Sequence, residues 1–388
     1  MIAAAQYSLW AALGLIAFAY VGYPTAIFAL SRLFGRRPVA LPLNHDRVPR
    51  VSVLVSALNE EEVIAERIEN NLAQDYPAER LEIVIASDGS TDRTAEIVGE
   101  FEAQYPGRVK LVDYSVRRGK ATAVNETLPQ VAGDIVVLSD ANTMFAKDAI
   151  SKLARWFADD SIGVVCGKLK LVDSASGKNV DGLYWRYETF LKECEGRLGA
   201  LLGSNGAIYA LRRQDFVPIP PDTIIDDFMI PLLVKIRRGK RIVYDTEAIA
   251  HEETAPDVRA EFRRRARIGA GGFQSLFRLS RLALPIYGWT SFAFLSHKVL
   301  RWLCPFLLIA ALIANLFLLT QPVYQVVFAL QVAFYLVAVA GVFLPGNYAA
   351  ARLVRLTTMF TSMNLALAVG FWRWVAGKQR GTWQRTAR

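Results

Sequence analysis

The stretch VSVLVSALNEEEVIAERIENNL (residues 51–72), followed by LEIVIASDGSTD (residues 81–92), decides the fold of this chain. Each part begins with a run rich in β-branched residues, which is the composition of a buried strand. Between the two runs, Ile64, Ile68 and Leu72 recur four residues apart and therefore share one face of a helix. The order strand, helix, strand predicts parallel strands joined by a covering helix.

The same alternation continues to about residue 280. Further strand-like runs occur at residues 109–112, 134–138, 162–172 and 207–211, and most are separated by polar segments of helix length. This pattern predicts a mostly parallel sheet covered on both faces by helices. In such sheets, ligands bind beyond the carboxyl ends of the strands.

Polar residues gather at those predicted strand ends. Asn59 and Glu60 follow the first strand, Asp88 follows the second, and Asp140 follows the fourth. Capping is an alternative role, because residues 90–92 are good N-cap types for a helix starting near residue 94 and Asn59 can cap the helix after it. All of them fall on one edge of one sheet, which favours a binding pocket.

An acidic pair, Asp226-Asp227, follows later in the chain, and Arg264, Arg265 and Arg267 come after it. Carboxylates can hold a divalent cation or take a proton, whereas arginine stays charged at any physiological pH and can stabilise a departing diphosphate. This order of charges is typical of an enzyme that moves a sugar off a nucleotide diphosphate.

Four apolar stretches predict contact with a membrane. They occupy residues 8–30, 303–319, 323–344 and 356–375, each near the ~20 residues that a span requires. We interpret the first as an anchor and not a signal peptide, since no basic residue precedes it and it exceeds the ~7–15 apolar residues of a signal core. Five arginines between residues 32 and 50 follow the anchor, so the positive-inside rule places the next domain in the cytoplasm.

The net charge of +9 does not indicate a nucleic-acid partner, because much of the excess lies beside the apolar stretches, where it attracts anionic lipid headgroups. Residues 257–281 form a basic, helix-like segment interrupted by glycines, which we expect to lie along the bilayer surface. The three cysteines lack CxxC spacing and the three histidines form no cluster, so neither a disulfide framework nor a zinc site is indicated.

These motifs, together with the Gly119-Lys120 and Asn125 segment, resemble membrane-bound family 2 glycosyltransferases, the group that includes hyaluronan, cellulose, chitin and poly-N-acetylglucosamine synthases. The resemblance covers nearly the whole chain, from Gly22-Tyr23-Pro24 to the C-terminal tail. It implies an α/β GT-A fold, a Rossmann-like mixed sheet in a cytosolic domain, with N- and C-terminal transmembrane helices. It also implies inversion at the anomeric carbon in one displacement, a nucleotide-sugar donor, and Mg²⁺ or Mn²⁺ as cofactor.

The resemblance assigns a role to each motif residue. Asp227 is the implied general base, with a helix-dipole charge as the structural alternative. Lys120 is an implied nucleotide contact, with a solvated lysine at a helix start as its alternative. The implied nucleotide-sugar residues are Asn59, Glu60, Asp88, Lys120, Asp140 and Arg267; the metal ligands are Asp140 and Asn142; the acceptor-side residues are Asp226, Asn205, Arg264 and Ile268.

Three positions depart from the family pattern. Ser87 stands where many relatives have an aspartate, so base contacts are thinner. Asn142 replaces the second carboxylate of the DxD motif, and we therefore expect weaker metal binding that depends on the nucleotide. In the QxxRW position, Arg264 replaces the glutamine and Ile268 the tryptophan, and an aliphatic side chain stacks on a sugar less well than a ring. Processive polymerisation is therefore in doubt.

The resulting domain division has five parts. They are a transmembrane anchor (residues 1–35), the cytosolic GT-A domain (47–255), amphipathic interface helices (256–300), a C-terminal transmembrane region (301–376) and a basic cytosolic tail (377–388). An anchor followed by three spans puts this tail outside, against the positive-inside rule. We therefore expect one C-terminal stretch to be re-entrant or interfacial, and residues 356–375, which contain Asn364 and Arg373, are the first candidate.

The leading interpretation is a multi-pass enzyme of the bacterial inner membrane that transfers a sugar from a UDP-sugar to a polysaccharide or lipid-linked glycan. One alternative is a processive synthase that also translocates its polymer. Another is a non-catalytic, nucleotide-binding membrane subunit, to which the altered DxD and QxxRW positions point. The sequence does not decide the sugar, the acceptor, the linkage or the oligomeric state.

Overall fold

The computed structural model describes residues 1–41, 48–172, 182–253, 258–343, 351–379 and 381. The chain forms two compact units, and each is described by itself. We call Met1–Ala26, Asp257–Arg278 and Phe294–Gln379 the helical unit, and Ile27–Pro256, Leu279–Ala293 and Arg380–Arg388 the sheet unit. Arg47 and the tail arginines at positions 380, 385 and 388 lie outside the described residues.

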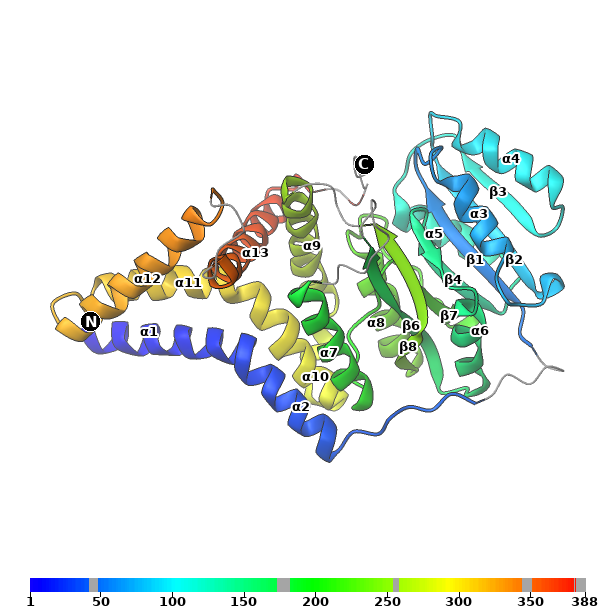
Figure 1. Ribbon diagram of the computed structural model, residues 1–388. Coiled ribbons are helices and arrows are strands. Elements are labelled where there is room, and N and C mark those ends of the chain that lie inside the picture. Colours follow the sequence, from blue (N-terminus) through cyan, green and yellow to red (C-terminus); the bar gives the residue numbers. More distant parts are fainter. Residues whose placement is uncertain (42–47, 173–181, 254–257, 344–350, 380, 382–388) are drawn as a thin grey trace. The chain divides into compact units, whose positions relative to one another are not determined.

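An eight-stranded mixed sheet organises the sheet unit (Figure 1). Its strands are β1 Val51–Ala57, β2 Leu81–Asp88, β3 Val109–Tyr114, β4 Ile135–Asp140, β5 Thr143–Phe145, β6 Ile162–Val172, β7 Tyr209–Arg212 and β8 Arg241–Glu253. Their spatial order is β3-β2-β1-β4-β7-β6-β8-β5. The parallel pairing predicted for the first four strands is confirmed, and β7 runs antiparallel to both of its neighbours.

Helices cover both faces of this sheet. They are α3 Ile64–Leu72, α4 Thr94–Gln104, α5 Lys120–Thr127, α6 Ala149–Ala154, α7 Leu183–Arg197 and α8 Asp226–Arg238. The short helix α10, Trp289–Ala293, also belongs to this unit. Apolar residues of α3, α4 and α6 form one continuous core with alternate residues of the strands. Figure 1 shows α3 and α4 beside the β1–β3 end of the sheet.

Two strands were not predicted. β8 carries Asp245 and Glu247 in its middle, and its register against β6 shifts twice, so its sequence lacks the plain alternation of a strand. β5 has three residues and pairs antiparallel with β8 at the edge of the sheet. Both elements depend on tertiary pairing, and they bring residues 250–252 next to the turn after β4.

Helix α3 is joined to β5 by a polar clamp. Asn70 accepts a hydrogen bond from Phe145 N at 2.8 Å and donates one to Phe145 O at 3.0 Å. Arg67 is fully buried, donates to the Asn70 amide oxygen at 2.9 Å and stacks its guanidinium 4.0 Å from the centre of the Phe145 ring. Burial lowers the pKa of Arg67 to about 9, although Asp140 favours its charged form. The clamp fixes the strand that follows Asp140.

Removing the clamp is expected to destabilise the sheet unit. Asn70→Ala deletes both bonds to the β5 backbone and leaves Arg67 without its acceptor, so we expect a loss of about 2 kcal/mol in the free energy of unfolding. Thermal denaturation in detergent measures the effect. Gln104→Ala, at an exposed position ending α4, is the control and should leave Tm unchanged. An equal Tm for Asn70→Ala contradicts the role given to the clamp.

The helical unit contains the long apolar helices. Helix α1, Ile2–Ala17, continues through a π-helical turn at Phe18–Gly22 into α2, Tyr23–Leu33, which belongs to this unit as far as Ala26. The other long helices are α11 Leu300–Leu316, α12 Pro322–Ala340 and α13 Ala351–Val375. Within the described residues, four helices are long and apolar enough to cross a membrane: Ile2–Leu33, Trp289–Leu316, Pro322–Ala340 and Leu353–Val375. The prediction that one C-terminal stretch is re-entrant stays a prediction.

The basic segment forms α9, Val258–Arg278, and packs against α13 through small residues. A Cβ added at Gly370 of α13 would meet the backbone of Ala266 and Ala270 of α9. A Cβ added at Gly272 would lie 2.6 Å from the indole of Trp302. Gly272 of this basic segment and Gly370 of α13 are therefore points of close helix contact within the helical unit.

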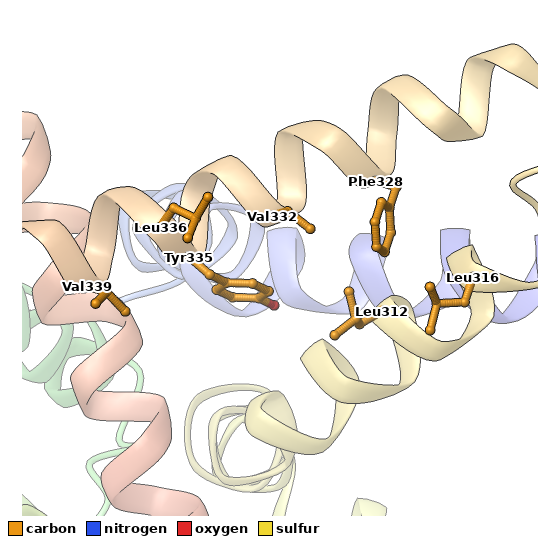
Figure 2. A pocket seen from close by; sticks show the side chains of 7 residues that line it. All are labelled: Leu312, Leu316, Phe328, Val332, Tyr335, Leu336 and Val339. Atoms are coloured by element: carbon orange, nitrogen blue, oxygen red, sulfur yellow. The ribbon is translucent and has the colours of Figure 1, made fainter.

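An apolar groove lies between α11 and α12. Leu312 and Leu316 of α11 line it opposite Phe328, Val332, Tyr335, Leu336 and Val339 of α12, around a cavity of about 250 Å³ (Figure 2). Side chains of this kind offer no partner to a charged ligand, so the groove suits hydrocarbon and is unsuited to a nucleotide.

Candidate functional site

The loop between β3 and α5 is built around the buried carboxylate of Asp88, the last residue of β2. Its Oδ1 accepts a hydrogen bond from Arg118 N and its Oδ2 accepts one from Gly119 N, both at 2.8 Å. Gly119 has φ +93°, a conformation that favours glycine, and it directly precedes α5. Asp88 thus fixes where α5 begins and where the side chain of Lys120 starts.

Lys120 lies among carboxylates. Its Nζ is 2.7 Å from Asp140 Oδ1 and 3.4 Å from Asp226 Oδ2, and its side chain is only 17% exposed. Burial alone would lower the pKa of Lys120, but the carboxylates of Asp140, Asp226 and Asp227 together raise it above the ordinary value. The alternative of a solvated lysine at a helix start is therefore wrong.

Asp140 and Asp227 face the same glycine. A Cβ added at Gly206 would lie 3.2 Å from Asp140 Oδ2 and 3.6 Å from Asp227 Oδ2. The loop before Gly206 fits the first turn of α8, because Ser204 donates to the backbone oxygen of Asp227 from both its N and its Oγ, at 3.0 and 2.8 Å. Four charged residues from β4, α5 and α8 therefore meet at one edge of the sheet.

Asn142 and Glu252 form a pair beside this cluster. Asn142 Nδ2 donates to Glu252 Oε1 at 3.2 Å, across the β5–β8 pairing. Glu252 was not predicted as a site residue, because the strand that brings it there was not predicted.

A divalent cation fits this edge only with help from its ligand. Asp140 and Asn142 supply oxygen atoms, but within the part of the chain that the structure describes no three His, Cys, Asp or Glu side chains form a cluster that could hold a metal ion. Mg²⁺ is commonly held by one or two carboxylates with substrate phosphates completing its shell. The donor set present here suits that mode of binding.

The loops after β1 and β2 are tied to each other. Asn59 has φ +55° and accepts a hydrogen bond from Thr91 N at 2.7 Å, while Glu60 N donates to Thr94 Oγ1 at 2.8 Å. Capping accounts for Asp92, whose Oδ1 accepts from Thr94 N at 3.0 Å. Asn59 does not cap α3, which begins at Ile64, and it serves instead as a tie between the two loops.

Two other asparagines from the sequence motifs hold backbone segments. Asn205 donates to Gly167 O at 3.0 Å and accepts from Ile208 N at 3.1 Å. Asn125 of α5 donates to Ile219 O at 2.7 Å and accepts from Ile219 N at 3.0 Å. Both side-chain amides are hydrogen-bonded to backbone groups of the sheet unit. Asn205 thereby links Gly167 of β6 to Ile208, the residue before β7.

The predicted residues of the QxxRW position lie on α9, in the helical unit. Arg264 and Arg265 both pair with Glu261 of the same helix, at 2.9 and 2.7 Å. Burial alone would raise the pKa of Glu261, but these two arginines lower it. Ile268 is 36% exposed, and Arg267 follows Ala266 at the contact with α13. The sheet unit gathers Lys120, Asp140, Asp226 and Asp227, and Arg264, Arg267 and Ile268 belong to the other unit.

Comparison with known proteins identifies the family of this chain. Residues 52–217 match the model of glycosyl transferase family 2, and residues 135–374 match that of glycosyl transferase family group 2. A β-monoglucosyldiacylglycerol synthase of Synechocystis sp. is 30% identical over 58% of this chain and 48% of its own length. A poly-β-1,6-N-acetyl-D-glucosamine synthase of Staphylococcus epidermidis is 27% identical over 60% of this chain and 57% of its own. The chain thus spans about half the length of these curated relatives.

One solved structure matches over nearly the full length. The mannosyltransferase PcManGT from Pyrobaculum calidifontis, in complex with GDP-Man and Mn²⁺, superposes with a TM-score of 0.73 at 23% identity and covers 97% of this chain and 100% of its own. The predicted GT-A fold is therefore confirmed. The family model that spans more than half of the chain settles its membership. The chain belongs to family 2 of the glycosyltransferases.

Proposed function

We propose that this glycosyltransferase transfers a sugar, with inversion, from a UDP-sugar to a polysaccharide or lipid-linked glycan acceptor. The observation that carries the proposal is the meeting of Lys120, Asp140, Asp226 and Asp227 at the carboxyl edge of the sheet. A direct displacement needs a base for the acceptor hydroxyl and positive charge for the departing diphosphate. This edge holds both within one cluster.

Each residue has a distinct task in the proposal. Asp227 takes the proton of the acceptor hydroxyl. Lys120 donates hydrogen bonds to the diphosphate. The loops of Asn59, Glu60 and Asp88 border the nucleotide, and Arg267 adds charge for the leaving group. Asp226, Asn205, Arg264 and Ile268 belong to the acceptor side.

Asp140 and Asn142 are the residues that would hold Mg²⁺ or Mn²⁺. A bound cation would supply positive charge against the diphosphate oxygens. Lys120 already neutralises part of Asp140, so the chain on its own should hold the cation weakly. This supports the expectation that metal affinity depends on the nucleotide.

The proposed setting is the bacterial inner membrane, with several spans, membrane lipids as neighbours and the sheet unit in the cytosol. Four apolar helices and the basic residues that follow the first of them support this placement. The names of the two relatives denote a glycolipid product and a polysaccharide product, so both acceptor classes enter the proposal.

UDP release by the detergent-purified protein tests the proposal. A panel of UDP-sugars is assayed with Mg²⁺ and with Mn²⁺, with native membrane lipids added, and the product is sized by mass spectrometry. We expect release with one sugar and the addition of single residues, because Ile268 stands where processive relatives have tryptophan. Long polymer would instead support the processive alternative, and no release with any UDP-sugar would overturn the donor class.

Replacing the proposed metal ligand gives a further prediction. Asp140→Asn removes one negative charge and one strong oxygen donor, so the Mn²⁺ concentration for half-maximal UDP release should rise at least about tenfold. Asp148→Asn, at a surface ion pair with Lys152, is the control and should not change it. An unchanged metal requirement in Asp140→Asn would assign the cation to other residues.

A further inference from the structure

A buried hydroxyl without a partner lies in the strand next to the site. Tyr209 of β7 is 0% exposed, and its OH makes no hydrogen bond within the described part of the chain. An unsatisfied buried hydroxyl costs free energy that phenylalanine would not incur at the same position. Such a group calls for an explanation in function or in an unseen partner.

The pairing of β7 fixes the face on which this side chain lies. Tyr209 is directly opposite Leu138 of β4 and Cys166 of β6, and directly opposed residues share a face of the sheet. Asp140 is two residues beyond Leu138 and lies on that same face. The neighbours Ile208 and Ala210 belong to the core on the opposite face, with α3 and α6. The Tyr209 ring therefore lies on the face of the catalytic carboxylates.

An unsatisfied acceptor is present in the same cluster. Asp226 Oδ2 is buried and accepts no hydrogen bond within the described residues, and it forms an ion pair with Lys120 Nζ at 3.4 Å. Burial and then the carboxylates of Asp226, Asp227 and Asp140 raise the pKa of Tyr209 well above its usual value. Tyr209 is therefore a neutral phenol, able to donate, across the pH range in which the enzyme would be assayed.

We propose that Tyr209 is a positioning residue for sugar transfer, whose hydroxyl donates a hydrogen bond to the Asp226 carboxylate through one buried water. The donor holds the Asp226 side chain beside Asp227 when the diphosphate draws Lys120 away from it. The proton of the acceptor hydroxyl then passes to Asp227, and Tyr209 keeps its own proton throughout. This role rests on the function proposed above for the same site.

Tyr209→Phe tests the proposal because it removes one oxygen atom and leaves the ring in place. If the hydroxyl has no partner, its removal breaks no hydrogen bond. A tyrosine with only a structural role therefore predicts an equal or higher Tm and an unchanged kcat. Our proposal predicts that kcat falls about tenfold while KM for the UDP-sugar changes less than about twofold.

Thermal stability separates the two accounts further. A hydroxyl that donates to the buried Asp226 carboxylate stabilises the fold, so the proposal predicts a lower Tm for Tyr209→Phe, whereas a hydroxyl without a partner predicts an equal or higher Tm. The carboxylates that act on the Tyr209 hydroxyl are those of Asp226, Asp227 and Asp140, and burial raises the pKa of the facing Cys166 thiol.

The control is Tyr76→Phe. Tyr76 is also buried, but its OH donates to Pro49 O at 2.6 Å, so its loss should lower Tm and leave kcat unchanged. A Tyr209→Phe enzyme with wild-type kcat and an equal or higher Tm overturns the inference. If the wild type released no UDP, the donor proposal would fail, and the Tm of Tyr209→Phe, which needs no sugar, would still decide whether its hydroxyl donates to a partner.

Discussion

We expect the kcat for sugar transfer of an Asp227→Asn variant to be lower than that of the wild type by a factor of about 10² to 10⁴, because an amide cannot take the proton of the acceptor hydroxyl. Asparagine has nearly the same shape as aspartate. The bonds from Ser204 reach the backbone oxygen of residue 227 and do not depend on its side chain. Nucleotide affinity should therefore stay within a few-fold of the wild type. UDP release and calorimetric UDP binding measure the two quantities.

The structural alternative for Asp227 predicts a different outcome. If Asp227 is only a charge in the first turn of α8, its replacement would lower the free energy of unfolding by about 0.3 to 1 kcal/mol and would change the activity little. Asp160→Asn is a matched control, since the Asp160 side chain is 94% exposed and pairs only with Arg212 among the described ion pairs. If Asp227→Asn had a lower Tm but kept most of the wild-type kcat, Asp227 would not be the general base.

The first half of the fold could be predicted because its signals are local. In residues 51–140 each strand is a short apolar run, and the predicted strands end within two residues of β1–β4. The edge of the sheet then followed from the rule that parallel strands end together. Asn59, Asp88 and Asp140 were placed on that edge by this argument alone, and the structure puts them there.

In the second half, β6 and β7 were predicted from their apolar runs, but β8 and β5 could not be, because their pairings are made over long distances in sequence. β8 and β5 take their register from each other and from β6. The hydrogen bond between Asn142 and Glu252 joins residues 110 positions apart, and no periodicity in the sequence indicates it. Tyr209 has the sequence features of an ordinary core residue within an apolar run, and it is distinguished by a hydroxyl that has no partner among the described residues.

The charge state of the site also depends on contacts that a motif does not show. The Gly119-Lys120 motif identifies Lys120 without indicating its partners. In the structure Lys120 forms ion pairs with Asp140 and Asp226. Without it, these two residues would be partly buried carboxylates near Asp227 that lack this cationic partner. In the proposed function, the lysine would compete with a divalent cation for Asp140, and the competition would end when the ammonium group moved to the bound diphosphate.

A Lys120→Met variant is therefore expected to change metal and donor affinity in opposite directions. Without the ammonium group, Asp140 and Asp226 should attract Mn²⁺ more strongly in the absence of nucleotide, by about tenfold or more. The diphosphate would lose a buried charge, so kcat/KM for the UDP-sugar should fall by about 10² or more. Electron paramagnetic resonance of Mn²⁺ and steady-state UDP release measure the two effects.

The controls for this variant follow from the same charges. Lys152→Met removes a lysine that pairs with Asp148 at the surface, and it should alter neither quantity. Because the carboxylates raise the pKa of Lys120, its stabilising pairings persist below its ordinary pKa near ~10.4 and are lost only at higher pH, as the folded pKa is passed. The metal difference between wild type and Lys120→Met should consequently be constant from about pH 6 to 9. Equal Mn²⁺ affinity in the two proteins would mean that the cation binds away from Asp140, while unchanged kcat/KM would remove Lys120 from the donor site.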